Sequence, residues 1–63
     1  MKMPWGKYEG IDLAFINSGT LKWYLEQDWF IMEQPETLVI AVENELEERE
    51  KTNSHFYKDK VRV

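Results

Sequence analysis

A lysine and a tyrosine stand together between two glycines in "MPWGKYEG", residues 3–10. Lys7 and Tyr8 on a glycine-hinged turn could grip a phosphate or a nucleobase. The stretch is not a P-loop, because the Gly-Lys-Ser/Thr ending is missing. Gly6 and Gly10 also accept positive φ at low cost, so the turn could serve the fold alone. Both interpretations of the turn are open from the sequence.

The nucleic-acid interpretation extends to other residues. Positive charge beside stacking rings is typical of proteins that bind single strands. Trp5 and Tyr8 are also needed for the core of so short a chain, and each basic cluster is small. The candidate nucleic-acid contacts are Lys2, Lys7, Tyr8 and Lys22.

A row of glutamates is the second group that could do chemistry. Glu43, Glu47 and Glu50 share one face of a predicted helix. One rigid helix cannot wrap an octahedral ion, so we interpret them as a solvated or partner-binding face and assign no metal and no cofactor. The candidate protein-interaction residues are Trp29, Phe30, Ile40, Glu43, Glu47 and Glu50.

Nucleophilic catalysis lacks its parts in this chain. There is no cysteine, and the single histidine, His55, lies far along the sequence from Ser18 and next to Ser54 in the tail. A catalytic serine needs a base within hydrogen-bond reach, and little here supports one. We assign no catalytic residue and expect no enzyme.

Composition and charge limit the remaining classes. The chain has 63 residues with three each of Trp, Tyr and Phe, enough for one small aromatic core. Residues 26–50 hold nine acids against Arg49, whereas residues 51–63 are basic overall. One protein partner or a nucleic acid is expected, and a homo-oligomer stays open. The longest apolar run, Leu38–Val42, is too short for a membrane span, so the expected location is the cytoplasm, or the host cytoplasm if a phage encodes the protein.

The predicted fold class is α+β, a small single domain over residues 1–54 with a basic tail or edge strand at 55–63. An N-terminal β-hairpin or turn is expected to pack on two helices at about 18–27 and 35–52, with the edge strand at 56–62. Asn17 or Ser18 is suited to cap the first helix. Residues 28–34, "DWFIMEQ", are predicted to be a buried connection or a frayed helix end, and a binding patch if exposed.

Ring packing is expected to hold the N-terminal segment in place. Trp5 and Tyr8 should pack toward Trp23, which leaves Lys7 at the surface as the one candidate contact of the turn. The residues assigned to this structural motif are Trp5, Gly6, Gly10, Leu13, Leu21 and Trp23.

The same residues carry a resemblance. "MPWGKYEG", Leu13 and "LKWYL" at 21–25 resemble a family of short bacterial and phage proteins catalogued as a domain of unknown function, some of them described as quorum-sensing-regulated virulence factors. A similar motif forms the C-terminal accessory domain of DnaQ-like, exodeoxyribonuclease X-type exonucleases. Glu9 stands where relatives carry a second lysine, Thr20 where they carry a tyrosine, and Asn17 where a proline is frequent.

The resemblance implies a function in nucleic-acid metabolism and a phage or bacterial origin. The catalytic acids of the exonuclease relatives lie in a separate, larger domain that has no counterpart in these residues. The function expected is therefore a small non-enzymatic binding protein associated with nucleic-acid metabolism. The alternative is an acidic effector that binds a host protein through its Glu-rich helix and aromatic connection.

Overall fold

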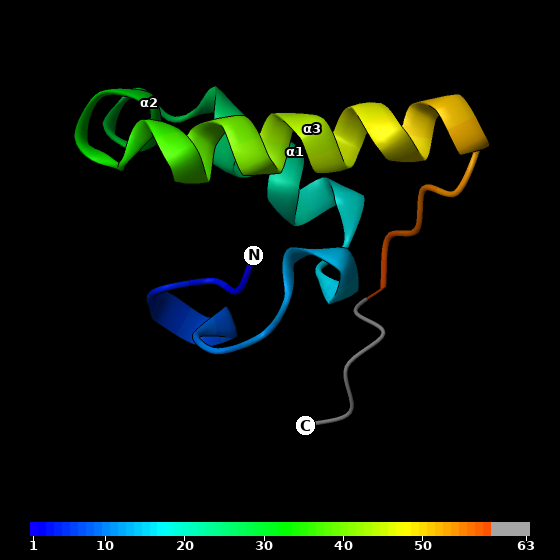
Figure 1. Cartoon of the computed structure of the whole chain (residues 1–63), viewed down its shortest axis with the longest axis horizontal. Helices are drawn as coiled ribbons and strands as arrows, with labels where there is room; N and C mark the ends of the chain where they lie inside the picture. Colours follow the sequence, from blue (N-terminus) through cyan, green and yellow to red (C-terminus); the bar gives the residue numbers. More distant parts are fainter. Residues whose placement is uncertain (59–63) are drawn as a thin grey trace.

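A computed structural model describes residues 1–58, and this part of the chain is mostly helical (Figure 1). The longest helix packs on both shorter helices and on the second of two 3-10 turns. In Figure 1 it runs along the top, and the N-terminal segment curls below it. The elements in chain order are η1 (Gly6–Tyr8), η2 (Leu13–Phe15), α1 (Ser18–Glu26), α2 (Asp28–Glu33) and α3 (Glu36–Thr52).

The α+β fold class with an N-terminal β-hairpin is wrong. Residues 1–58 contain no strand, only an antiparallel bridge between Lys2 and Asp12 and a parallel bridge between Met3 and Glu9. Two bridges of opposite sense cannot form one ladder. The turns η1 and η2 take up the residues that a second strand would need. The N-terminal segment is therefore a closed loop, tied by hydrogen bonds from the Met3 N–H to the Ile11 carbonyl and from the Gly10 N–H to the Met3 carbonyl, both 2.8 Å.

The edge strand predicted at 56–62 is likewise not seen over the residues that can be compared. Positions 55–58 contain no strand. The remainder of that prediction, and of the tail at 55–63, lies outside the described residues.

Glycine is required at two positions of the N-terminal loop. Gly6 has φ 78° and Gly10 has φ 80°, in the left-handed region that side chains with a Cβ avoid. A Cβ at either position would meet no atom within 4 Å. The requirement is therefore one of backbone conformation and not of space.

Polar side chains and proline set the helix ends. The Asn17 side chain accepts from the Thr20 N–H at 2.7 Å and caps α1. Gln27 is extended and separates α1 from α2, so residues 28–33 form a helix of their own and not a frayed end of α1. Gln34 precedes Pro35 and is extended in turn, as expected before a proline.

The C-terminal end of α3 reverses the chain. Asn53 is left-handed, with φ 53°. The Ser54 N–H donates to the Arg49 carbonyl at 2.9 Å and the Asn53 N–H to the Glu50 carbonyl at 3.4 Å. This pair of bonds is the Schellman arrangement, and it turns residues 54–58 back toward the N-terminal loop (Figure 1).

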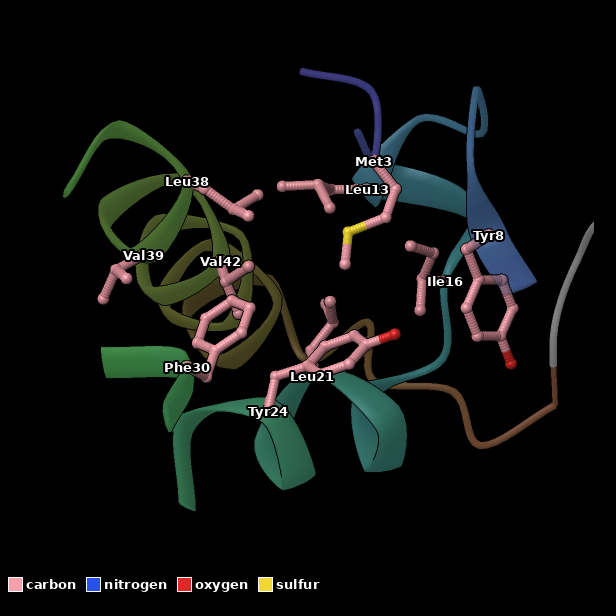
Figure 2. Close-up of a cluster of buried hydrophobic side chains, with 10 residues drawn as sticks. All are labelled: Met3, Tyr8, Leu13, Ile16, Leu21, Tyr24, Phe30, Leu38, Val39 and Val42. Atoms are coloured by element: carbon pink, nitrogen blue, oxygen red, sulfur yellow. The ribbon is translucent and has the colours of Figure 1, made fainter. Parts of the chain in front are cut away.

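The core joins the N-terminal loop to all three helices (Figure 2). Figure 2 shows side chains from the loop facing those of α1 and α3, with Phe30 from α2 closing one side. Half-buried Trp5, Leu25 and Leu46 pack against this cluster. In the part of the chain that is described, no helix is long and apolar enough to cross a bilayer. The buried hydrophobic residues are Met3, Tyr8, Leu13, Ile16, Leu21, Tyr24, Phe30, Leu38, Val39 and Val42.

Candidate binding surfaces

The four candidate nucleic-acid contacts do not share one accessible site. Tyr8 is buried, so its ring face is not available to stack on a base. Lys7 is exposed and lies over that ring, with its Nζ 5.5 Å from the ring centroid. Lys2 is exposed and bridges to Asp12 through the backbone. Only Lys7 and Lys2 therefore remain as exposed cations of the N-terminal loop.

Lys22 lies elsewhere, in a groove between α1 and α3. The groove has a volume of about 500 Å³ and is open to solvent on one side. Leu25 of α1 and Leu46 of α3 contribute its apolar surface. The Lys22 Nζ lies 3.5 Å from the Tyr57 hydroxyl at the edge of this region. The residues lining the groove are Lys22, Leu25, Glu43, Leu46, Glu47, Glu50 and His55.

The three glutamates of the predicted row do line one site. Glu43, Glu47 and Glu50 follow one another along α3 at helical spacing and surround Leu46. Glu47 also pairs with Lys51 at 3.4 Å, and both side chains stay largely exposed. With three carboxylates against one lysine, the groove attracts cations and repels phosphate.

A cluster of aromatic rings joins the N-terminal loop to α1 and α2. Trp5 is its hub, with ring centroids 5.6 Å from Tyr24, 5.8 Å from Trp29 and 6.2 Å from Phe30. The Trp5 indole N–H donates to the Gln34 Oε1 at 2.7 Å. The direct packing of Trp5 on Trp23 that we expected is not seen; Trp29 contacts both rings, with its centroid 6.1 Å from that of Trp23.

The aromatic connection at 28–34 is only partly buried. Phe30 is fully buried and cannot contact a partner, contrary to its assignment as an interaction residue. Trp29 is 38% exposed and Trp23 is 50% exposed. Met32 is 82% exposed, one turn beyond Trp29 on α2. Ile40, on α3, is exposed as well and does not line the groove.

Arg49 was not predicted to have a role, yet among the described residues it is the charged side chain with the most hydrogen bonds to the protein. It is 3% exposed. Its Nη2 donates to the carbonyls of Leu13 at 3.0 Å and Ala14 at 3.3 Å, and its Nε donates to Glu45 at 2.9 Å. The guanidinium carbon lies 4.4 Å from the Phe56 ring centroid. Arg49 therefore connects α3 both to η2 and to Phe56 in the segment after α3.

Ser18 and His55 also meet at this point, although they are 37 residues apart. The Ser18 Oγ is 2.8 Å from His55 Nδ1 and accepts from Arg49 Nη1 at 3.1 Å. The Ser18 N–H donates to the Phe56 carbonyl at 2.8 Å. Ser18 is fully buried, so its hydroxyl cannot reach a substrate. We therefore interpret the pair as part of the same set of contacts, the Arg49 clamp (Arg49, Glu45, Ser18, His55 and Phe56).

A weak pattern in the sequence points to Arg49. It follows Val42 by seven residues and Leu46 by three, so it continues the buried stripe of α3. A charged residue at such a position is either exposed or buried with hydrogen-bond partners. The sequence does not distinguish these cases here, because most partners of Arg49 lie more than 30 residues away. Among the side chains that the structure covers, no group of three or more His, Asp or Glu could hold a metal ion.

We compared the chain with family models, curated proteins and solved structures. No family model, no curated protein and no solved structure matches the chain.

Proposed function

We propose that this protein is a non-enzymatic binding module that takes a basic, amphipathic segment of a partner protein in the groove between α1 and α3. The observation that carries the proposal is the combination of apolar and acidic groups in that groove. Leu25 and Leu46 offer apolar surface, and the carboxylates of Glu43, Glu47 and Glu50 surround it. Such a surface suits a short segment with one or two apolar side chains flanked by lysines or arginines.

The charge of the chain supports the same partner. Residues 26–48 contain no lysine or arginine, so α2 and most of α3 carry acids alone. The resulting field accelerates the approach of a basic partner and weakens with salt. Burial of Leu25 and Leu46 against the partner would then supply the part of the affinity that does not depend on salt concentration.

An NMR titration with a synthetic peptide tests this proposal. The probe is the acetylated and amidated peptide Lys-Leu-Lys-Lys-Leu-Leu-Lys-Lys, followed through the backbone amides of α1 and α3. We expect shifts centred on Leu25 and Leu46. Glu43→Lys with Glu47→Lys should weaken binding at least tenfold, because each change replaces attraction by repulsion.

A charge-matched control distinguishes binding in the groove from attraction of the peptide by the net negative charge of the chain. Glu36→Lys with Glu48→Lys makes the same change in net charge at exposed positions of α3 that do not line the groove. We expect a loss of about twofold from the control pair. Equal losses from both pairs would reject the groove as the binding site.

A nucleic-acid function, which the family resemblance implies, is the second candidate. It is supported by Lys7, which is exposed on the turn that carries the resemblance. A fluorescence-anisotropy titration with single-stranded and duplex DNA at low salt tests it. Binding that Lys7→Glu weakens would favour this candidate, whereas no binding at tens of micromolar would remove it.

A further inference from the structure

We infer that Trp23 and Trp29 form a second recognition surface, one that docks the guanidinium of an arginine side chain from a partner protein. This tryptophan surface is defined by Trp23, Trp29 and the acids Glu26, Asp28 and Glu33. It goes beyond the groove proposal, because it uses other residues and another chemistry.

The two rings are held in place from behind. Their centroids lie 6.1 Å apart with their planes at 64°. Trp29 packs on Phe30 at 5.9 Å and on Trp5 at 5.8 Å, while Trp23 packs on Tyr24 at 5.5 Å. Both rings nevertheless expose between a third and a half of their surface. A pair of exposed indoles fixed by packing loses little side-chain entropy when it binds a ligand.

The protein's own cations lie on other rings. In the part of the chain that the structure describes, the cation–ring pairs are Lys7 over Tyr8, Lys22 over Tyr57 at 5.8 Å and Arg49 over Phe56. Each of these rings is a phenol or a phenyl. Indole is the strongest cation binder among the aromatic side chains. The two most suitable rings therefore stay open to a cation from outside.

Three exposed acids lie within about one helical turn of the two tryptophans and favour a cationic ligand. Glu26 follows Trp23 by three residues on α1, and Glu33 follows Trp29 by four on α2, so each lies one turn from its tryptophan. Asp28 begins α2 beside Trp29. All three acids are exposed. Carboxylates at the edge of an aromatic face favour a bound cation and disfavour a phosphate.

Arginine fits this surface better than lysine does. A guanidinium is planar, stacks on an indole face and donates to carboxylates in pairs, and it is less strongly hydrated than an ammonium. Arg49 already shows this combination inside the protein, with its guanidinium over Phe56 and its Nε on Glu45.

The tryptophan surface is distinct from the groove. Lys22 and Leu25 of α1 line the groove. Successive residues of an α-helix are rotated by about 100°, so Trp23 points well away from both. Ligands of the two surfaces can therefore be told apart by the residues that they perturb.

The test uses three blocked octapeptides, (Arg-Gly)₄ and its analogues with citrulline or lysine in place of arginine. Citrulline keeps the shape of arginine and removes its charge. Binding is followed through the indole N–H resonances, one for each tryptophan. We expect (Arg-Gly)₄ to shift the signals of Trp23 and Trp29 more than that of Trp5, with affinity at least threefold above the lysine peptide and no shift from the citrulline peptide.

Two variants and their controls complete the test. Trp23→Leu should weaken (Arg-Gly)₄ binding about fivefold, whereas Phe15→Leu, at an aromatic residue of nearly equal exposure on η2, should leave it unchanged. Glu26→Gln should weaken it about twofold, and Glu48→Gln should not. The groove variant with Glu43→Lys and Glu47→Lys should keep the shift at the indoles.

Three results would overturn the inference. The first is equal binding of the citrulline peptide, which would mean that the cation is irrelevant. The second is an unchanged affinity in Trp23→Leu, which would assign the attraction to net charge alone. The third is indole shifts that depend on protein concentration without peptide, accompanied by a dimer in sedimentation, which would make a second copy the occupant.

Discussion

The Arg49 clamp and the tryptophan surface contain the same kinds of group in opposite states. Arg49 is buried, stacks on Phe56 and donates from each of its three side-chain nitrogens to an oxygen atom of the protein. Trp23 and Trp29 are partly exposed, and exposed acids lie within about one turn of them on α1 and α2. In the clamp, a cation, a ring and a carboxylate satisfy one another. At the tryptophan surface, no cation of the described residues stacks on the indoles.

This difference separates stability from recognition. A buried guanidinium is costly to desolvate, and the hydrogen bonds of Arg49 to Glu45, Ser18 and the η2 carbonyls offset this cost in the folded state. A partly exposed indole contributes less to the stability of the fold, and its exposed face can still contact a ligand. The clamp should therefore respond to mutation through the free energy of unfolding, and the tryptophan surface through binding.

Arg49→Met should give the largest effect. The change removes the Arg49 hydrogen bonds to the Leu13 and Ala14 carbonyls, the Ser18 hydroxyl and Glu45, and we expect the free energy of unfolding to fall by about 3 kcal/mol. Urea denaturation measures it. Arg49→Lys should lose about half as much, and Lys51→Met, at an exposed cation of the same helix, close to nothing. A loss below 1 kcal/mol for Arg49→Met would show that the clamp does not stabilise the fold.

Ser18→Ala should cost about 1–2 kcal/mol, because it leaves one N–H of Arg49 buried without an acceptor. Ser54→Ala, at an exposed serine after α3, is the matched control and should change the free energy of unfolding little. Thermal unfolding of both variants gives the comparison. Equal stability of Ser18→Ala and the parent protein would remove Ser18 from the clamp.

Gly10→Ala tests whether the N-terminal turn, like the Arg49 clamp, contributes to the free energy of unfolding. We expect a loss of about 1–2 kcal/mol in chemical denaturation, since alanine is strained at φ 80° although no atom crowds its Cβ. Gly10→Asn should cost less, because asparagine tolerates this conformation better. Equal losses from the two variants would point to a cause other than backbone strain.

Trp23→Leu should change the free energy of unfolding by about 0.5 kcal/mol or less, because half of the side chain is already in solvent. Denaturation of the variant used in the arginine titration measures this directly. A loss above about 1.5 kcal/mol would mean that Trp23 stabilises the core, and the contrast with the clamp would fail.

Asp12→Asn should have the smallest effect, and one that depends on pH. The Ala14 N–H donates to the Asp12 carboxylate at 3.0 Å and, with the N-terminal ammonium and Lys2, lowers the pKa of Asp12. A lowered pKa in the folded state stabilises the protein above the unfolded value of about 3.9, and this stabilisation is lost as the pH falls further. Because the Asp12 side chain is 43% exposed and screened by solvent, we expect a few tenths of a kcal/mol at pH 7 and none at pH 2. An effect that is constant from pH 7 to pH 2 would contradict this origin.

Two of the three helices in the described residues could be predicted from local patterns, whereas α2 was expected to be a buried connection or a frayed helix end. Helices were expected at 18–27 and 35–52, and α1 and α3 lie at Ser18–Glu26 and Glu36–Thr52. The Asn17 cap, the stripe of Leu38 and Val42 and the proline at 35 are all short-range features, so they can be read within one or two turns. The sequence also predicted the row of Glu43, Glu47 and Glu50, but it did not predict the groove that they line.

The N-terminal segment shows why the rest was missed. Two glycines that accept positive φ fit a hairpin and a closed loop equally well, and the 3-10 turns η1 and η2 distinguish the two. Phe30 and Trp29 are adjacent and both aromatic, yet only Trp29 can contact a partner. No local pattern distinguishes them, because burial depends on the direction from which Trp5 approaches.

Short-range physics thus accounts for the helices, the left-handed glycines and the uneven charge along the chain. Each of these follows from interactions within about four residues, which the order of the amino acids specifies. Tertiary packing alone decided that Arg49 is buried, that Ser18 meets His55 and that Trp23 and Trp29 face solvent side by side. Those outcomes join residues up to 37 positions apart, and they depend on how helices and loop pack together, which no local pattern encodes.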